Sequence, residues 1–97
     1  MVYELILDKR AEDDLLSLDP SIAMKLVEQI EKKLCFYPLA FGEYLSGDLH
    51  PHHKLRIGEY RVVYRVQEEK KEVMVFVVGK RKDNEVYDLA MKRLWKS

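Results

Sequence analysis

The stretch His53–Val66, HKLRIGEYRVVYRV, decides the fold because it predicts two strands joined by a tight turn. Gly58-Glu59 places glycine at the first central position of a two-residue turn, as a type II′ hairpin requires. The turn sets the register, since side chains alternate between the faces of a strand. One mostly apolar side is then formed by the facing pairs Ile57 and Tyr60, Leu55 and Val62, and His53 and Tyr64. The opposite side receives Lys54, Arg56, Arg61, Val63 and Arg65.

This register places Arg56 directly opposite Arg61. Like charges so placed destabilise a sheet by roughly a few tenths to 1 kcal/mol, so folding alone does not favour the pair. A phosphate bridged by the two guanidinium groups would reverse the sign of the interaction. The structural alternative is that acids from the first half of the chain, such as Glu43 or Asp48, pair with these arginines.

Composition indicates one compact domain spanning residues 1–97. The chain has 97 residues, 47% of them hydrophobic and 35% charged, with a formal net charge of zero. Residues 1–49 hold five Lys or Arg against ten Asp or Glu, whereas residues 50–97 hold twelve against seven. The second half is therefore able to meet a polyanion.

The location of the protein is expected to be cytoplasmic. The longest apolar run, Val73–Val78, is too short to cross a bilayer, and the first ten residues are too charged for a secretion signal. The single cysteine, Cys35, lies between Leu34 and Phe36, which favours a buried structural thiol over a nucleophile.

The remaining segments predict an α+β protein of order β-α-α-β-β-β-α, with a mainly antiparallel sheet, a helical hairpin on one face and a C-terminal helix. Pro20 fits the first turn of the second helix, which Asp19 can cap. Val73–Val78 is apolar on both faces, as expected of a central covered strand. The expected segments are a strand at 2–7, helices at 8–18 and 20–34, a connection at 38–51, and a last helix capped by Asp83 or Asn84.

A metal site is not expected. The segment His50-Pro51-His52-His53 is rich in histidine, but Cys35 on its helix is the one remaining residue of the Cys and His types. Alternation also turns His52 and His53 to opposite faces of a strand. We therefore predict neither a metal nor another cofactor.

The chain resembles the RelE branch of the RelE/ParE toxin superfamily over nearly its whole length. The segments that carry the resemblance are LSGDL at 45–49, LRIGEYRVVYRV at 55–66, VFVVGKR at 75–81 and EVYDLAMKRL at 85–94. The hairpin elements are shared across the superfamily, whereas GKR followed by Tyr87 is more specific to the RelE branch. The resemblance implies a RelE-like fold and the toxin of a toxin–antitoxin pair, which cuts messenger RNA in the ribosomal A site without metal. It also implies a RelB-like antitoxin as partner.

The resemblance also implies a cluster of cations and one tyrosine. Lys54, Arg61, Arg81 and Tyr87 match catalytic positions of RelE-like enzymes. His52 stands where such enzymes have a first lysine, and imidazole is a competent acid or base near neutral pH. The residues expected to bind RNA without taking part in the chemistry are Arg56, Arg65, Lys80 and Lys82.

These residue types suit cleavage of RNA by its own 2′-hydroxyl. Arg61 and Arg81 are expected to stabilise the charge of the phosphorane-like transition state. Tyr87 is a reasonable base if crowded cations lower its pKa, or it could stack on a nucleobase. Lys54 or His52 could hold the phosphate or carry the other proton. In plainer readings, Arg81 pairs with Glu85 and Tyr87 is ordinary packing.

Two other functions compete with the nuclease. A ParE-like inhibitor of DNA gyrase would bind without hydrolytic chemistry, and the joint presence of Lys54, Arg61, Arg81 and Tyr87 argues against it. An inactive relative that only binds its antitoxin is favoured by the missing first lysine. An antitoxin segment with acidic residues would suit the cationic face.

Overall fold

The computed structural model describes residues 2–45, 49, 51–80 and 85–96. The chain forms three helices and five strands in these residues, and the order matches the expected one apart from an added short strand. The elements are β1 (Glu4–Leu7), α1 (Lys9–Leu16), α2 (Pro20–Leu34), β2 (Glu43–Tyr44), β3 (His53–Ile57), β4 (Tyr60–Gln67), β5 (Glu72–Lys80) and α3 (Glu85–Lys96).

The five strands form one sheet in the order β1-β5-β4-β3-β2. β1 runs parallel to β5, and the other neighbours are antiparallel, so the predicted α+β class and mainly antiparallel sheet are confirmed. The expectation that 38–51 is only a connection is wrong, since Glu43–Tyr44 pairs with Lys54 and His53 as β2. Two residues are too few to produce a detectable alternation in the sequence.

The hairpin of β3 and β4 has the predicted register. The facing pairs are His53 with Tyr64, Leu55 with Val62, Ile57 with Tyr60, and Arg56 with Arg61. Gly58 has φ 58°, and Lys71 is the one described non-glycine residue with positive φ, so Glu59 lacks it. A positive φ at the first central residue alone is the pattern of a type II′ turn.

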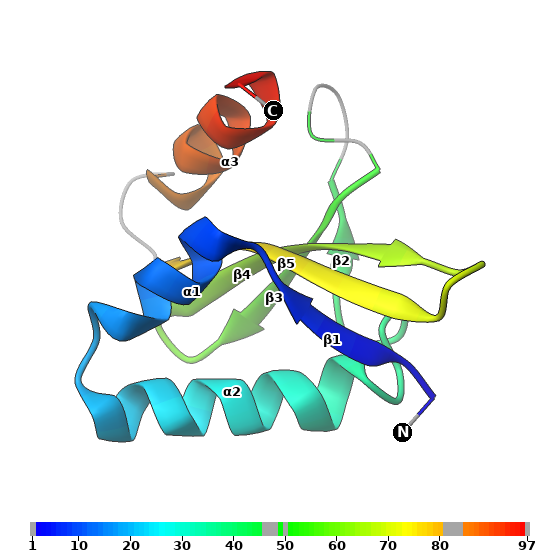
Figure 1. The fold of residues 1–97 in the computed structure, drawn as a ribbon, viewed down its shortest axis with the longest axis horizontal. Coiled ribbons are helices and arrows are strands. Elements are labelled where there is room, and N and C mark those ends of the chain that lie inside the picture. The colour runs from blue at the N-terminus through cyan, green and yellow to red at the C-terminus, as the bar shows by residue number, and fades with distance from the viewer. Residues whose placement is uncertain (1, 46–48, 50, 81–84, 97) are drawn as a thin grey trace.

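The sheet separates two apolar clusters, and Figure 1 shows α2 below the sheet and α3 above it. The α2 face of the sheet carries Leu55, Tyr60, Val62, Tyr64, Val73 and Val75, packed with α1 and α2. The α3 face carries Val63 and Val77, packed with Val86 and Ala90 of α3. The prediction that residues 73–78 are covered on both sides is confirmed, because these two clusters share β5.

A β-bulge in β5 changes which side chains reach the α3 face. Val63 pairs with Val77 and the next residue, Tyr64, pairs with Val75, so Phe76 is the additional residue. Phe76 and Val77 both contact the cluster beneath α3, although consecutive strand residues normally face opposite ways. The bulge therefore adds an aromatic ring to the packing under α3.

Local capping accounts for the two N-terminal helices. Asp8 accepts a hydrogen bond from the backbone N–H of Arg10 (2.9 Å), and Asp19 accepts one from that of Ser21 (3.0 Å). Pro20 opens α2, as predicted. Cys35 follows α2 and is fully buried, and desolvation raises the pKa of its thiol, which agrees with a structural role.

The segment between α2 and β2 is held by one buried tyrosine. The Tyr64 hydroxyl donates a 2.6 Å hydrogen bond to the carbonyl of Pro38, and burial raises the pKa of Tyr64 to about 12. The hydroxyl is therefore protonated, and able to donate, throughout the physiological pH range. Gly42 lies against the same hydroxyl, and a Cβ at Gly42 would overlap it.

Replacing Gly42 with alanine is therefore expected to destabilise the protein by about 2–3 kcal/mol, the cost of overpacking a filled site. Urea unfolding followed by circular dichroism measures this free energy. Leu39→Ala is the control in the same segment, because Leu39 is exposed and its loss should change stability by less than about 0.5 kcal/mol. Equal effects of the two changes would contradict the packing of Gly42 on Tyr64.

Candidate functional site

Lys54 and Tyr87, which are far apart in the sequence, meet on the α3 face of the sheet. The Lys54 Nζ atom lies 5.6 Å from the centroid of the Tyr87 ring, within the range of a cation–π contact. Tyr87 is partly buried and its ring also packs against the cluster beneath α3. The ammonium group of Lys54 also lies 3.4 Å from Glu43 Oε2 on β2. A cation, a phenol and a carboxylate are thus brought together.

Arg61 lies on the same face and is held by backbone carbonyls. Its side chain is buried, with 8% of the residue exposed, and Nη1 donates to the carbonyl oxygens of Gly58 (3.0 Å) and Tyr60 (2.9 Å). Among the side chains that the structure describes, which do not include that of Glu85, no carboxylate lies within 4.0 Å of Arg61 or of Arg56 opposite it. The proposed pairing of these arginines with Glu43 is therefore wrong, and Asp48 lies outside the described residues. The guanidinium charge of Arg61 is fixed in place and not neutralised by these carboxylates.

A glycine allows α3 to approach the sheet beside Arg61. Gly79 faces Arg61 across β4 and β5, and a Cβ at Gly79 would meet Val86 Cγ2 at 3.0 Å. Few side chains are accommodated at such a distance without movement of the neighbour. Val86 precedes Tyr87, so the close contact at Gly79 helps to set the position of the tyrosine over Lys54.

The other end of α3 is attached through a bidentate ion pair. Arg93 Nη1 and Nη2 donate to Asp14 Oδ2 (2.8 Å) and Oδ1 (2.9 Å), and both side chains are largely buried. Arg93 also donates to the Phe76 carbonyl (2.7 Å), and Asp14 accepts from the Val78 N–H (3.0 Å). The two side chains therefore satisfy backbone hydrogen-bonding groups at the edge of β5 next to the bulge. Their ion pair also joins α1 to α3, so α1, β5 and α3 are held together.

His52 is packed within the site and does not lie at its surface. It has 4% of its surface exposed, its Nδ1 lies 3.1 Å from the Leu49 carbonyl oxygen, and its ring stands edge-on to Phe76 at 4.9 Å. His53 points to the opposite side, where its ring stacks on that of Tyr64 and lies tilted against that of Tyr44. The prediction that the two histidines face opposite ways is confirmed.

The remaining predicted residues are not all gathered at this position. Arg56 and Arg65 are exposed on the α3 face by register. Lys80 pairs with Tyr60, whose ring belongs to the α2 face, and its Nζ lies 3.9 Å from Glu59. Lys80 thus diverges from Lys54 and Arg61. Arg81 and Lys82 lie outside the described residues, as do the expected caps Asp83 and Asn84.

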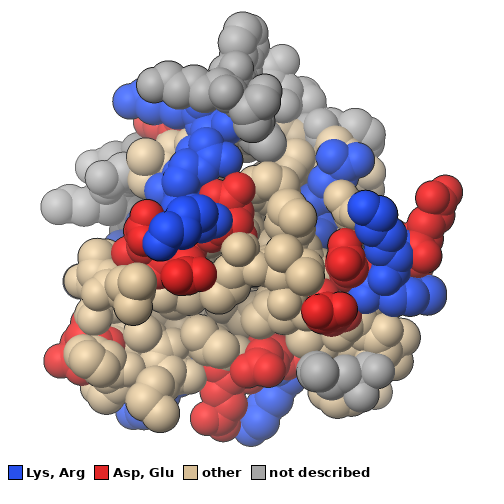
Figure 2. All heavy atoms as spheres, in the orientation of Figure 1, with Lys and Arg blue, Asp and Glu red and all other residues tan. Residues whose placement is uncertain are grey.

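Charges elsewhere are mixed. Figure 2 shows basic and acidic side chains interleaved on the face that it presents. In the described part of the chain, no three His, Cys, Asp or Glu side chains are grouped as metal ligands would be. Of the helices formed by those residues, none has the length and apolarity needed to cross a bilayer.

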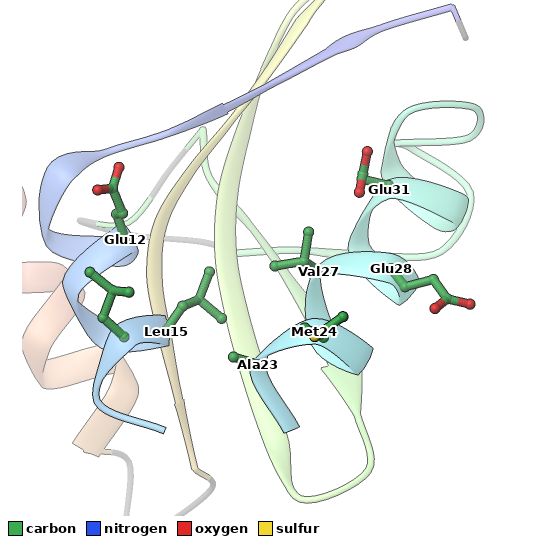
Figure 3. Close-up of a pocket in the computed structure, with 8 residues that line it drawn as sticks. Glu12, Leu15, Ala23, Met24, Val27, Glu28 and Glu31 are labelled. Carbon is green, nitrogen blue, oxygen red and sulfur yellow. The ribbon is translucent and has the colours of Figure 1, made fainter. Parts of the chain in front are cut away.

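A separate groove of about 520 Å³ lies between α1 and α2. Figure 3 shows Leu15, Ala23, Met24 and Val27 around it, with three carboxylates from the same two helices near its margin. Those acids are Glu12, Glu28 and Glu31. Its lining residues all belong to α1 and α2 and include neither Lys54 nor Tyr87, so the groove is distinct from the site on the α3 face.

Sequence reasoning did not find three residues that shape the site. Glu43 was considered only as a partner for arginines, and its contact with Lys54 depends on a strand too short to recognise. Asp14 and Arg93 appear in the sequence as ordinary charged positions of amphipathic helices. No local signal in the sequence marks them as partners, because the two residues are 79 positions apart.

The family of this chain is shown by its similarity to known proteins. Residues 5–85 match the family described as the ParE toxin of the type II toxin–antitoxin system parDE. The chain is 38% identical to the mRNA interferase toxin RelE of Escherichia coli K12 over 99 residues, covering 97% of this chain and 99% of RelE. This chain therefore belongs to the ParE toxin family of type II toxin–antitoxin systems, and within it to the RelE-like proteins, as the resemblance indicated.

Solved structures give the same result. The toxin–antitoxin complex RelBE2 from Mycobacterium tuberculosis matches with a TM-score of 0.78 at 31% identity, covering 84% of this chain and 100% of that one. A mutant of E. coli RelE in the free state matches with a TM-score of 0.77 at 31% identity, covering 97% and 99%. The α+β architecture is therefore that of RelE toxins.

The anchoring of α3 can be tested by replacing Asp14 with asparagine. This change leaves Arg93 without its carboxylate in a largely buried position, and we expect a loss of about 2–3 kcal/mol in unfolding free energy. Asp13→Asn is the matched control on the same helix, because the Asp13 ion pair with Lys9 is exposed and should contribute less than about 1 kcal/mol. Chemical denaturation of both variants measures the difference, and equal losses would refute the anchoring role.

Proposed function

We propose that this protein is a toxin that acts as a messenger RNA endoribonuclease on the ribosome, in the cytoplasm, without a metal cofactor. The observation that carries the proposal is the meeting of Lys54 and Tyr87 on the face that also holds the Arg61 guanidinium, which is fixed by two backbone carbonyls and has no carboxylate partner among the described side chains. The family membership and the RelE relatives support the same activity. The RNA 2′-oxygen forms a bond to the adjacent phosphorus while the bond from phosphorus to the 5′-oxygen breaks. The products are a 2′,3′-cyclic phosphate and a 5′-hydroxyl end, whose oxygen takes its proton from the Lys54 ammonium group.

Arg61 and Arg81 stabilise the added charge of the phosphorane-like transition state. Arg61 is suited to this role because two carbonyls hold its Nη1, which leaves the other guanidinium nitrogens to donate to phosphate oxygens. Arg81 enters the proposal from its position in the GKR motif. Rigid placement matters, since a preorganised charge needs no rearrangement as the reaction proceeds.

Tyr87 serves as the base that removes the 2′-hydroxyl proton, and Lys54 holds the phosphate beside it. The Lys54 ammonium group lies 5.6 Å from the centroid of the Tyr87 ring, so the phenol stands beside the cation that holds the phosphate. His52 is less suited to carry a proton to the substrate, because it is 4% exposed and packed on Phe76 and Leu49. We assign it to supporting the site. Arg56 and Arg65 bind flanking phosphates from their exposed positions, and Lys80 and Lys82 contribute at the margin.

The alternative of gyrase inhibition has one observation in its favour, the ParE description of the matching family. The two functions predict different outcomes in cells that express the protein without its antitoxin. A nuclease produces messenger fragments with ends at codon positions, whereas a gyrase inhibitor stops DNA synthesis first. Mapping transcript ends after induction separates them.

The expected partner is a RelB-like antitoxin, as in the RelBE2 complex. The groove between α1 and α2 offers an apolar floor, including the 73% exposed Met24, and a margin of three glutamates. These features suit an amphipathic antitoxin helix that carries basic residues beside its apolar stripe. A second, acidic antitoxin segment would cover the cations of the α3 face.

Replacing Arg61 with alanine is expected to reduce messenger cleavage on ribosomes by about a hundredfold or more. The reason is that the change removes a preorganised donor that stabilises the transition state. Growth inhibition should be lost with it. Lys25→Ala is the control, because Lys25 is exposed on α2 and should leave cleavage unchanged. Circular dichroism shows whether the fold is retained. A folded Arg61→Ala protein with native toxicity would contradict the site.

Replacing Met24 with glutamine is expected to weaken antitoxin binding by about tenfold, because an exposed apolar contact in the groove is lost. Cleavage by the free toxin should not change. Lys25→Gln, next along α2 and outside the groove lining, is the matched control. Isothermal titration with the antitoxin measures the affinity, and an unchanged value for Met24→Gln would place the antitoxin elsewhere.

A further inference from the structure

Glu43 has an unusual position for an acid in a site that should receive RNA. Its Oε2 atom lies 3.4 Å from Lys54 Nζ, and Glu43 pairs directly with Lys54 in the register of β2 and β3. Among the carboxylate side chains that the structure describes, Glu43 is the one within 4.0 Å of Lys54, Arg56 or Arg61. A phosphate that approaches Lys54 therefore meets a negative charge already in place.

The contact between Glu43 and Lys54 follows from the register of β2 and β3, which places the two residues directly opposite each other. Side chains of directly paired residues point to the same face, so Glu43, Lys54 and Val63 form one row beneath Tyr87. Lys54 is 35% exposed and lies between the carboxylate and the aromatic ring, whereas Glu43 is 77% exposed. The carboxylate can move away from the row while the lysine stays.

We propose that Glu43 is an internal counter-ion that occupies Lys54 in the free protein and is displaced by the RNA phosphate. Glu43 holds the ammonium group over Tyr87 before substrate arrives, and it lowers affinity for RNA because it competes with the phosphate for that ammonium group. It is a positioning residue that touches Lys54 and does not join the chemistry. This inference rests on the proposed function, since it concerns the phosphate bound at Lys54.

The proposal predicts a particular pattern of effects. An ion pair this exposed contributes little to stability, so Glu43→Gln should leave the unfolding midpoint unchanged. Affinity for RNA should rise by about two- to fivefold, because this gain corresponds to the free energy of one partly exposed ion pair. Lys54 then releases a counterion when it binds phosphate, so the slope of log K against log salt should steepen by up to about 0.7. The maximal cleavage rate should change less than twofold.

The test uses ribosomes programmed with a messenger whose A-site codon carries 2′-deoxynucleotides, which binds but cannot be cut by the proposed attack. Toxin binding is measured for the native protein, Glu43→Gln and Glu68→Gln over a range of salt concentrations. Glu68→Gln is the matched control, because it removes the same charge from an exposed ion pair, the one that Glu68 forms with Lys71. The same variants are compared in a Lys54→Met background, where the effect of Glu43→Gln should vanish. Cleavage of an unmodified messenger gives the maximal rate.

Tighter binding by Glu43→Gln than by Glu68→Gln, lost in the Lys54→Met background, supports the counter-ion role. Binding by Glu43→Gln equal to or weaker than that of the control overturns it, as does a gain that persists without Lys54. If no variant binds the programmed ribosome, the counter-ion role is also overturned. If the native protein binds but does not cut the unmodified messenger, the nuclease function fails while the binding comparison still decides the role of Glu43.

Discussion

The site depends on one constraint: the backbone N–H and carbonyl groups at the outer edge of β5, beyond the end of β1, need hydrogen-bond partners. β1 pairs with β5 only as far as Leu7 and Val75, after which the described residues supply no strand to continue that edge. Asp14 and Arg93 take the place of a strand there, and their hydrogen bonds satisfy the N–H of Val78 and the carbonyl of Phe76. Buried backbone groups require such partners. Since Arg93 belongs to α3, meeting this requirement also fixes the helix that carries Tyr87.

The sheet therefore has two faces with different roles. The α2 face holds a continuous apolar cluster, and its main task is stability. The α3 face holds a smaller cluster in one area and cations in another, since Lys54, Arg56 and Arg61 lie beside Val63. The apolar part docks α3, whereas in the cationic part Arg56 and Lys54 remain accessible to a polyanion and Arg61 lies buried beside them. Figure 1 shows α3 covering only part of the sheet on this side.

The repulsion between Arg56 and Arg61 is tolerated because backbone carbonyl groups partly offset its energetic cost. The carbonyls of Gly58 and Tyr60 point at the guanidinium of Arg61, and these dipoles stabilise its charge without neutralising it. An acid in the same place would give a more stable sheet and a weaker anion site. Glu43 is bonded instead to Lys54, at the outer end of the face, where its exposure keeps the interaction weak.

The sequence by itself determined the elements whose cause is local. The turn at Gly58-Glu59 set the hairpin register, and through it the opposition of Arg56 and Arg61 and the opposite directions of His52 and His53. Asp19-Pro20 set the start of α2, and the family motifs indicated Lys54 and Tyr87. These features follow from backbone geometry and side-chain alternation over a few residues, which a sequence records directly.

Only the tertiary structure decided the parallel pairing of β1 with β5, the bulge at Phe76, the two-residue strand that brings Glu43 to Lys54, and the junction of Asp14 with Arg93. Each joins segments distant along the chain, or involves too few residues to produce a periodic pattern. The burial of His52 is of the same kind, since it depends on where Phe76 and Leu49 come together around the ring. Long-range packing, unlike alternation, leaves no local trace in the order of residues.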